Sequence, residues 1–284
     1  MSVRVLVTGS NGQLGSDVTK LFSSEHEVTG TDRRQMDLAA PSTIEKVLTK
    51  VGPDLVVHCG AYTKVDLAEE ERDLCRSINA EATRVIAARA GENGFRLIYM
   101  STDYVFDGTK PEPYETDDPP HPINYYGETK LEGELAVREL TKRYQIIRTS
   151  WVFGANGGNF VKTMIRLGKE RDTVQVVSDQ IGSPCYTKDL ARLILDMARS
   201  DRYGTYHATN EGYCSWHQFA TEIMRKQGLG TKVEAIESKQ YPTKARRPKN
   251  SRLSKRSLDE GGFRRLPTWE DALDRYLLEI KEAQ

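Results

Sequence analysis

The sequence contains little cysteine and no long hydrophobic segment. Its 284 residues include four cysteines, at positions 59, 75, 185 and 214, and no C-x-x-C pair. This spacing gives no support for a zinc knuckle, a thioredoxin-like site or a disulfide framework. No segment approaches the ~18 apolar residues of a membrane-spanning helix, and the apolar run Val3–Val7 is too short for a signal peptide. We therefore expect reduced thiols, no membrane partner and a cytoplasmic location.

Net charge is also absent. The 41 Lys and Arg residues balance 41 Asp and Glu residues, which excludes a global electrostatic attraction to nucleic acids or acidic membranes. One local exception is the segment 244–256, called the basic run below, which holds seven basic residues and no acidic one. The basic run lacks the aromatic residues on which bases stack, so we expect no nucleic-acid partner. A solvated face is the simplest alternative for these charges.

What the sequence does contain is an alternation of short apolar runs with helical patterns. The patterns predict strands over 3–7, 27–30, 54–59, 96–100, 145–151, 174–177 and 204–208, and helices over 14–22, 43–50, 69–90, 159–168 and 187–199. Apolar strands separated by helices are typical of a parallel sheet covered on both faces. The predicted fold class is therefore α/β: a Rossmann-type doubly wound parallel sheet with a smaller C-terminal α/β substrate lobe.

The same patterns suggest two domains. Residues 1–152 form the predicted dinucleotide-binding Rossmann domain, to which the chain returns at about 186–210. Residues 153–185 and 211–284 form the predicted smaller lobe, in which short helices alternate with loops. The segment 110–122 holds five prolines in thirteen residues and is predicted to be an irregular loop.

A glycine-rich turn follows the first predicted strand. Gly9, Gly12 and Gly15 have the spacing G-x-x-G-x-x-G. Glycines let the backbone turn tightly and approach a pyrophosphate, and the following helix offers free N–H groups and the positive end of its dipole. Ordinary turns also use glycine, but the position between the first strand and the first helix favours a dinucleotide site.

The end of the second predicted strand carries signals for both nicotinamide cofactors. Asp32 can accept hydrogen bonds from an adenosine ribose, which favours NAD. Arg33 and Arg34 can bind a 2′-phosphate, which favours NADP, although both could also be solvated surface charges. We expect NADPH to be preferred and NADH also to be accepted.

A tyrosine and a lysine lie four residues apart, at Tyr126 and Lys130, and therefore share one face of a helix. A nearby ammonium stabilises a phenolate and lowers the tyrosine pKa from its usual value near ~10, which improves a general acid. The spacing alone is common. Thr102 strengthens the interpretation of Tyr126 and Lys130 as catalytic residues. Its hydroxyl follows a predicted strand, at the sheet edge where ligands bind in open α/β folds.

Together these features resemble the extended short-chain dehydrogenase/reductase superfamily. Within it, a series of motifs is similar to that of the dTDP-4-dehydrorhamnose reductases. The motifs are STDYVF at 101–106, YGETK at 126–130, RTSW at 148–151, GNF at 158–160, DQIGSP at 179–184 and RPKNS at 247–251. The similarity covers nearly the whole chain, and the motifs are specific as a set rather than singly.

The resemblance implies that a hydride from NADPH reduces the C4 keto group of dTDP-4-dehydrorhamnose, giving dTDP-L-rhamnose. It implies that Tyr126 protonates the C4 oxygen, that Lys130 holds the nicotinamide ribose, and that Thr102 aligns the carbonyl. The implied cofactor-binding residues are Gly9, Asn11, Gly12, Gln13, Leu14, Asp32, Arg33, Asp37, Leu38, Ala61, Tyr62, Thr63, Ser101, Tyr126 and Lys130.

The implied substrate-binding residues are Thr102, Asp103, Trp151, Asn159 and Arg247. Of these, Trp151 could stack on the deoxysugar or simply be a core aromatic residue. Arg247 lies in the basic run and could clamp the pyrophosphate of the sugar nucleotide. The resemblance also implies a homodimer and, in some members, a divalent cation such as Mg²⁺ at a dimer contact. No residues here can be assigned to that cation.

Three alternatives remain at this point. Nucleotide-sugar 4,6-dehydratases resemble the same segment but have a Glu where this chain has Tyr104, and the missing Glu argues against elimination. Within the enzyme class, the runner-up is a 4-ketoreductase of another nucleotide deoxysugar. A non-catalytic regulatory subunit, like that of methionine adenosyltransferase, also resembles them, but a binding role does not require Thr102, Tyr126 and Lys130 together.

Overall fold

The computed structural model describes residues 2–282. Its largest element is a parallel six-stranded sheet in the order β10-β5-β4-β3-β1-β2. The strands are β1 (Arg4–Thr8), β2 (Glu27–Thr31), β3 (Leu55–His58), β4 (Arg96–Thr102), β5 (Tyr144–Thr149) and β10 (Gly204–His207). The strand order reverses beside β1, which creates a ligand-binding crevice at the carboxyl ends of β1 and β3. The predicted α/β fold class is confirmed.

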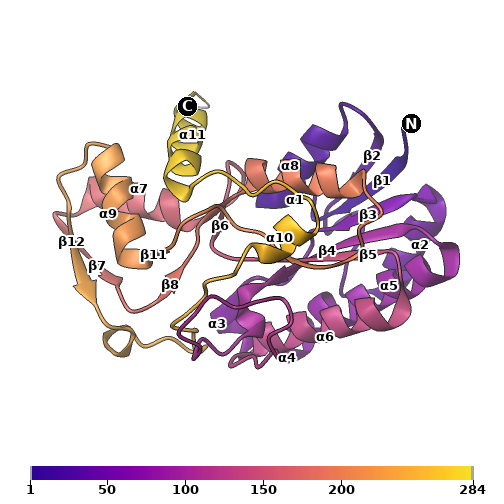
Figure 1. Cartoon of the computed structure of the whole chain (residues 1–284), viewed down its shortest axis with the longest axis horizontal. Coiled ribbons are helices and arrows are strands. Elements are labelled where there is room, and N and C mark those ends of the chain that lie inside the picture. The colour runs from indigo at the N-terminus through magenta and orange to yellow at the C-terminus, as the bar shows by residue number, and fades with distance from the viewer. Residues whose placement is uncertain (1, 283–284) are drawn as a thin grey trace.

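Helices cover both faces of the sheet (Figure 1). One face packs against α1 (Gln13–Phe22) and α8 (Thr187–Ala198), and the other against α2 (Pro41–Val51), α5 (Ala82–Asn93) and α6 (Tyr125–Leu140). Alternate residues of β1 point to opposite faces: Val5 and Val7 join the core under α1, and Leu6 joins the core under α5. Helices bury both faces of the sheet, which explains why the central strands β1, β3 and β4 appear in the sequence as nearly continuous apolar runs.

The helix predicted over 69–90 differs from the observed structure. A short helix α3 (Val65–Ala68) and a turn precede α4 (Arg72–Arg76), a π-helical turn η1 (Ser77–Glu81) and α5. The π turn bulges one residue outward and aims the Asn79 side chain at the backbone of Tyr62, which neither its composition nor its periodicity indicates. Gly94 ends α5 with a left-handed φ of 73°, as its position after the helical pattern predicts.

The smaller lobe has its own sheets and core. The parallel pair β7 (Thr173–Val177) and β12 (Lys232–Ile236) packs with α7 (Phe160–Glu170), α9 (Trp216–Lys226) and α11 (Trp269–Glu282). Two short pairs join it: β6 (Val152–Phe153) with β9 (Cys185–Tyr186), and β8 (Ile181–Gly182) with β11 (Cys214–Ser215). The helices α9 and α11 are longer than the predicted short ones because each has a full apolar stripe, as at Trp269, Leu273 and Tyr276.

The C-terminal segment does not stay in the lobe. Leu258, on α10 (Arg256–Glu260), and Leu266 are buried in the core beside β10. The helix α10 packs close to β10, and the His207 backbone N–H donates to the Ser257 hydroxyl at 3.0 Å. This return tethers the end of the basic run to the large sheet.

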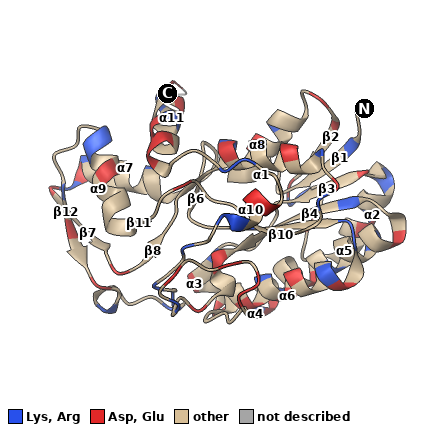
Figure 2. Cartoon of the chain, in the orientation of Figure 1, with Lys and Arg blue, Asp and Glu red and all other residues tan. Residues whose placement is uncertain are grey.

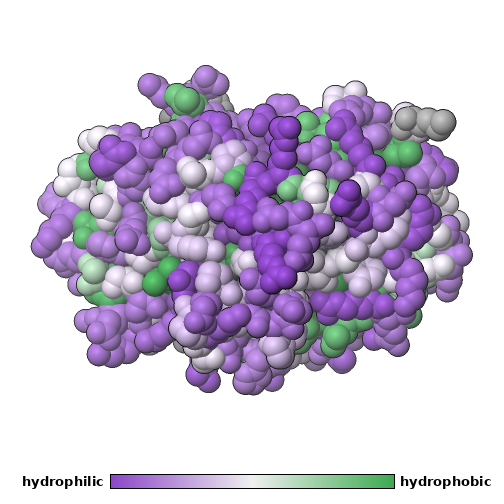
Figure 3. Space-filling model, in the orientation of Figure 1, coloured by the Kyte–Doolittle hydropathy of each residue, from purple (hydrophilic) through white to green (hydrophobic). Residues whose placement is uncertain are grey.

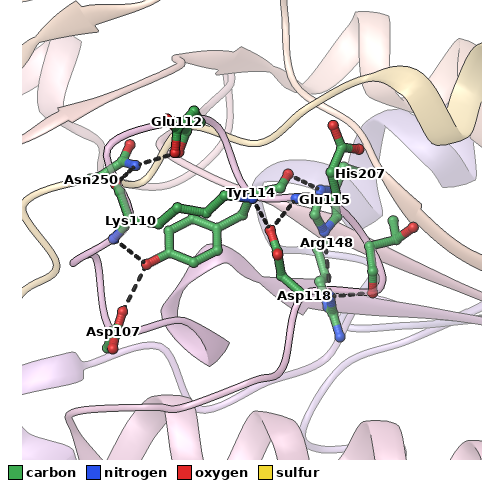
Figure 4. Close-up of polar contacts among 10 residues, drawn as sticks. Asp107, Lys110, Glu112, Tyr114, Glu115, Asp118, Arg148, His207 and Asn250 are labelled. Carbon is green, nitrogen blue, oxygen red and sulfur yellow. Dashed lines mark hydrogen bonds and ion pairs between the residues drawn. The ribbon is translucent and has the colours of Figure 1, made fainter.

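The proline-rich loop 110–122 lacks helix and strand, as predicted, but is firmly held (Figure 4). The Tyr114 hydroxyl donates to Asp107 at 2.7 Å, and Lys110 pairs with Asp118. The Asn250 amide donates to the carbonyls of Lys110 and Glu112. Hydrogen bonds of both backbone and side chains therefore hold the basic run against the loop 110–122.

Charges of both signs are mixed over the two lobes (Figure 2), and the face shown in Figure 3 is largely hydrophilic with isolated apolar residues. In residues 2–282 no helix is both long enough and apolar enough to cross a membrane. All four cysteines are free thiols.

Candidate active site

A cavity of about 520 Å³ opens at the carboxyl ends of β1, β3 and β4. It is lined by nearly the whole set of residues that the family resemblance assigns to a dinucleotide. These are Gly9, Asn11, Gly12, Gln13, Leu14, Asp32, Arg33, Asp37, Leu38, Ala61, Thr63, Ser101, Tyr126 and Lys130. Tyr62 differs, because its hydroxyl donates to Glu71 at 2.5 Å. Sequence reasoning missed the lining by Met36, Ile78, Met100 and Gly157, which come from segments without a recognisable motif, and by Gly158, which begins the GNF motif but was not assigned to the cofactor.

The glycine turn has the shape that a dinucleotide needs. Gly9 has φ +64°, and a Cβ there would lie 2.8 Å from Gly60 Cα. A Cβ on Gly15 would lie 2.1 Å from the Gly9 carbonyl oxygen, so only glycine lets α1 start this close to the turn. Gly12 at the N-cap offers no side-chain acceptor, so the first N–H groups of α1 are available to an anion. A pyrophosphate fits this turn.

The adenosine end of the cavity separates the two arginines that the sequence left equivalent. Arg33 lines the cavity and lies 3.8 Å from the Asp37 carboxylate. The Arg34 guanidinium folds back onto Asp32 at 3.2 Å, with 91% of its side chain exposed. The Asp32 carboxylate also accepts the Arg34 backbone N–H at 2.9 Å, so the turn itself occupies both carboxylate oxygens.

A buried polar floor supports the middle of the cavity. The Thr8 hydroxyl lies 2.7 Å from His58 Nδ1 and accepts the Gly60 N–H at 3.0 Å. Burial lowers the pKa of His58 to about 3, so this imidazole is a neutral core residue. The Asn79 side-chain carbonyl accepts the Tyr62 backbone N–H at 2.8 Å, and the Asn79 side-chain N–H donates to the Tyr62 carbonyl at 3.2 Å. Asn79 thereby positions the cavity-lining turn 61–63.

Thr102 and Tyr126 both belong to the carboxyl edge of the sheet, where α6 packs against β4. Thr102 is the last residue of β4, and Tyr126 is on the first turn of α6, whose N-cap Asn124 accepts the Gly127 N–H at 2.8 Å. Desolvation raises the pKa of Tyr126, the Asp103 carboxylate raises it further, and the hydrogen bond with Thr102 opposes both. The sequence prediction that Lys130 lowers this pKa is therefore wrong: burial raises the pKa of Tyr126, and Lys130 is not among the groups that shift it.

Lys130 is buried in the same cavity, with its ammonium 4.2 Å from the centre of the Tyr99 ring. Burial lowers the pKa of Lys130 to about 7, and the Glu134 carboxylate one helical turn away opposes this shift. Glu134 itself is fully buried and pairs with Arg148 at 2.7 Å. The Ser101 hydroxyl donates to Glu134 at 2.6 Å, so this network locks α6 onto β4 and β5. Sequence reasoning missed it, although Arg148 in an apolar strand signals a buried partner.

Asp103 follows Thr102 and lies beneath the surface, with 3% exposure. Its Oδ1 accepts the Thr102 hydroxyl at 3.0 Å. Its Oδ2 is buried and has no hydrogen-bond partner of good geometry among residues 2–282. Burial raises the pKa of Asp103 to about 6, and hydrogen bonds from Ser251 and Thr102 oppose the rise.

A second cavity, of about 790 Å³, is lined by residues of the smaller lobe together with Asp66 of α3. Phe160, Met164 and Trp216 provide an apolar wall, and Arg247, Asp66 and Tyr104 provide a polar one. Arg247 pairs with Asp66 at 2.7 Å and is partly buried. Other basic residues of the basic run also have acidic partners. Lys249, for example, pairs with Asp179 at 3.2 Å, so the basic run is not an unpaired positive patch.

Two predicted substrate-binding residues are engaged elsewhere. Trp151 has a positive φ of 47° and stacks on Trp216 with ring centres 3.6 Å apart. Asn159 caps α7 by accepting the Lys162 N–H, and its amide donates to the Gln13 side chain at 3.1 Å. Gln13 also accepts the Gly154 N–H at 3.0 Å, so Gln13 and Asn159 join the glycine turn to the lobe.

Comparison with known proteins identifies the family to which this chain belongs. The family model described as the RmlD substrate binding domain matches residues 3–282. The spore coat polysaccharide biosynthesis protein SpsK of Bacillus subtilis is 41% identical over 99% of each chain. A dTDP-4-dehydrorhamnose reductase of Burkholderia thailandensis is 39% identical over 95% of this chain and 97% of the relative. A crystal structure of dTDP-4-dehydrorhamnose reductase from Bacillus anthracis, in complex with NADP, is 44% identical. It superimposes with a TM-score of 0.95 over 98% of this chain and all of that chain.

The fold, the glycine turn and these similarities define an NAD(P)-dependent oxidoreductase of the extended short-chain dehydrogenase/reductase class. More narrowly, the chain belongs to the RmlD family, since the family model and full-length relatives cover nearly all of it. No group of three His, Cys, Asp or Glu side chains that could hold a metal ion is found in residues 2–282.

Proposed function

We propose that this protein uses NADPH to reduce the C4 keto group of dTDP-4-dehydrorhamnose, forming dTDP-L-rhamnose. The observation that carries the proposal is the cavity at the carboxyl ends of β1, β3 and β4, whose lining brings Tyr126 and Lys130 together with the glycine turn. The names of the Burkholderia and Bacillus anthracis relatives support the substrate, and the NADP of the latter supports the cofactor. The four free thiols support a reducing, cytoplasmic location.

NADPH supplies the hydride when it is bound, and Gly9, Gly12, Arg33 and Lys130 are among the residues that would hold it. The protein's own part is to control a proton. Tyr126 gives its hydroxyl proton to the oxygen on C4, where negative charge develops. Thr102 turns its hydroxyl from Asp103 to the carbonyl and keeps it in line. The ammonium of Lys130 stabilises the phenolate that Tyr126 becomes.

The second cavity is proposed to receive the nucleotide end of the substrate. Its apolar wall suits a thymine ring, and Arg247 is placed to contact the pyrophosphate. In this arrangement the Arg247 guanidinium either leaves Asp66 to contact the substrate or contacts Asp66 and the substrate together.

The test is Tyr126→Phe. We expect kcat to fall by ~10²–10⁴-fold, because the proton donor is lost, while the Kd for NADPH changes little. Tyr125→Phe is the matched control, since Tyr125 lies on the same helix turn but packs under Arg72, 4.5 Å from its guanidinium. NADPH oxidation at saturating keto-sugar nucleotide measures the rate, and NMR of the product establishes the configuration at C4. A Tyr126→Phe enzyme as active as the control contradicts the proposal.

A second substrate deserves the same assay. The SpsK relative, named for spore coat polysaccharide biosynthesis, is as similar to this chain as the named reductases are. A 4-ketoreductase acting on another nucleotide deoxysugar therefore remains the alternative, and the product NMR separates the two.

A further inference from the structure

We propose that Tyr99 is a positioning residue for Lys130: its ring binds the lysine ammonium and holds it at the wall of the first cavity. The inference rests on the proposed role of Lys130 in holding the cofactor. It gives a part in the reaction to a residue that lies outside the six sequence motifs and does not itself line the cavity.

The Tyr99 side chain contacts Lys130 at two points. The Lys130 Nζ lies over the Tyr99 ring, 4.2 Å from its centre, which is the geometry of a cation–π interaction. The Tyr99 hydroxyl donates to the Lys130 carbonyl oxygen at 3.3 Å. One residue of β4 therefore holds both the ammonium of Lys130 and the helical turn that carries it.

The Tyr99 ring is itself held from several sides. Its side chain is fully buried, and the His58 ring stacks against it with ring centres 5.7 Å apart. The Tyr99 hydroxyl oxygen also lies 3.4 Å from the Asn79 carbonyl oxygen. A Cβ on Gly133 of α6 would lie 2.3 Å from that hydroxyl oxygen. Glycine is unfavourable inside a helix, so the glycine at this position is explained by the space that the tyrosine needs.

The ring serves as the anchor because the carboxylate on the next helical turn is already engaged. Glu134 accepts the Arg148 guanidinium at 2.7 Å and the Ser101 hydroxyl at 2.6 Å. Within residues 2–282, no ion pair or hydrogen bond joins the Lys130 ammonium to another side chain. A buried ammonium without such a partner is costly, and the negative face of an aromatic ring offsets part of this cost.

An anchor without a charge leaves the ammonium able to act. A carboxylate partner would occupy N–H groups of Lys130 and neutralise its charge. The Tyr99 ring takes one side of the ammonium and leaves its other N–H groups as donors for the cofactor. The ring also favours the charged form of the lysine, against the burial that lowers the pKa of Lys130 to about 7.

The other ionisable groups that face Lys130 keep one charge state through the neutral pH range. They are the imidazole of His58, the thiols of Cys59 and Cys75, the carboxylate of Glu134 and the phenols of Tyr99 and Tyr126. Burial lowers the pKa of His58 to about 3 and raises the pKa of Cys59 to about 12. Lys130 is therefore the member of this group whose charge changes near neutral pH.

The first arm of the test changes the charge distribution of the ring and keeps its shape. The full chain is made with Tyr99→Phe and with phenylalanines at this position that carry increasing numbers of ring fluorines, which weaken the negative face. NMR of the ¹³C-lysine-labelled chain follows the Lys130 titration without substrate or cofactor, and Lys130→Arg assigns the signal. We expect Tyr99→Phe to keep the wild-type midpoint. Each added fluorine should lower the midpoint, by about 1 pH unit over the series, because a weaker face stabilises the ammonium less.

The second arm is Tyr99→Leu, which fills part of the space but has no ring face. The pH dependence of kcat/KM for NADPH reports groups of the free enzyme. Since the ammonium is the active form, the rate falls as pH rises through the Lys130 pKa. We expect the variant to move this limb about 1 unit to lower pH, which is about a 10-fold loss on its alkaline side and little loss on its acid side. A purely structural role would lower the rate by the same factor at every pH.

A Lys130 midpoint that stays constant across the fluorinated series overturns the proposal, and this arm decides alone if Tyr99→Leu does not fold. A Tyr99→Leu enzyme whose limb stays in place also overturns it. The proposed function fails in a different way. If Lys130→Met binds NADPH and turns over like the wild type, the role of Lys130 is wrong, and Tyr99 positions nothing for the reaction. If Lys130→Met is inactive while the fluorinated series shows no shift, Lys130 keeps its role and the anchor is wrong.

Discussion

Replacing Arg33 with alanine should change cofactor preference, because Arg33 alone of the two neighbouring arginines lines the cavity. A charge-assisted hydrogen bond to a phosphate is worth roughly 1.5–3 kcal/mol, or about 10- to 100-fold in affinity. The Arg33 side chain is 77% exposed and Asp37 competes for it at 3.8 Å, so the lower end applies. We expect the Kd for NADPH to rise about 10-fold and the Kd for NADH to stay nearly constant.

Arg34→Ala is the matched control for this experiment. Arg34 carries the same charge one residue away, but its guanidinium folds onto Asp32. Its loss should affect both cofactors equally and weakly, since the Asp32 carboxylate keeps its backbone partner. Quenching of protein fluorescence measures the four dissociation constants. Equal losses of NADPH and NADH in the Arg33 variant, or a larger NADPH effect in the Arg34 variant, would refute the assignment.

Two further results are expected. Arg247→Ala should raise KM for the keto-sugar nucleotide and leave the Kd for NADPH unchanged. The control Asp66→Asn breaks the same ion pair but keeps the cation, so it should not raise KM. If steady-state kinetics give the two variants the same KM, the pyrophosphate contact is contradicted. Lys130→Met should stabilise the fold most below pH 7 and least near pH 10. Burial lowers the Lys130 pKa to about 7, so between pH 7 and pH 10 the unfolded chain binds more protons than the folded chain, and wild-type stability rises with pH. If urea unfolding gives the wild type and the variant the same dependence of stability on pH, this expectation is contradicted.

The parts of the fold that were predicted from the sequence are those that local patterns encode. The central strands β1, β3 and β4 are nearly continuous apolar runs, and the glycine turn and the Gly94 cap require residues that allow unusual backbone geometry. The π turn at 77–81 was not predicted. It accompanies a tertiary hydrogen bond from the Tyr62 backbone N–H to the Asn79 side chain. Local periodicity carries no information about such a bond.

The candidate site shows the same division. Motif spacing indicated which residues line the first cavity, but not how charges inside it balance. The pair Glu134–Arg148 and the burial of Asp103 depend on how α6 lies against β4 and β5, and they determine the pKa values that the site works with. Likewise, Arg33 and Arg34 are indistinguishable in sequence and differ only once the turn after β2 is folded.

The position of β10 at the edge of the sheet has a consequence for how the chain is made. β10 pairs with β5, although residues 150–203, which include lobe segments and the sheet-covering helix α8, separate them, and Leu258 and Leu266 close the core over it. Until the ribosome has released these late segments, β5 presents an unpaired edge with open N–H and C=O groups. The nascent large sheet is therefore exposed to wrong pairing until synthesis is nearly finished, and chaperone protection matters most during that interval.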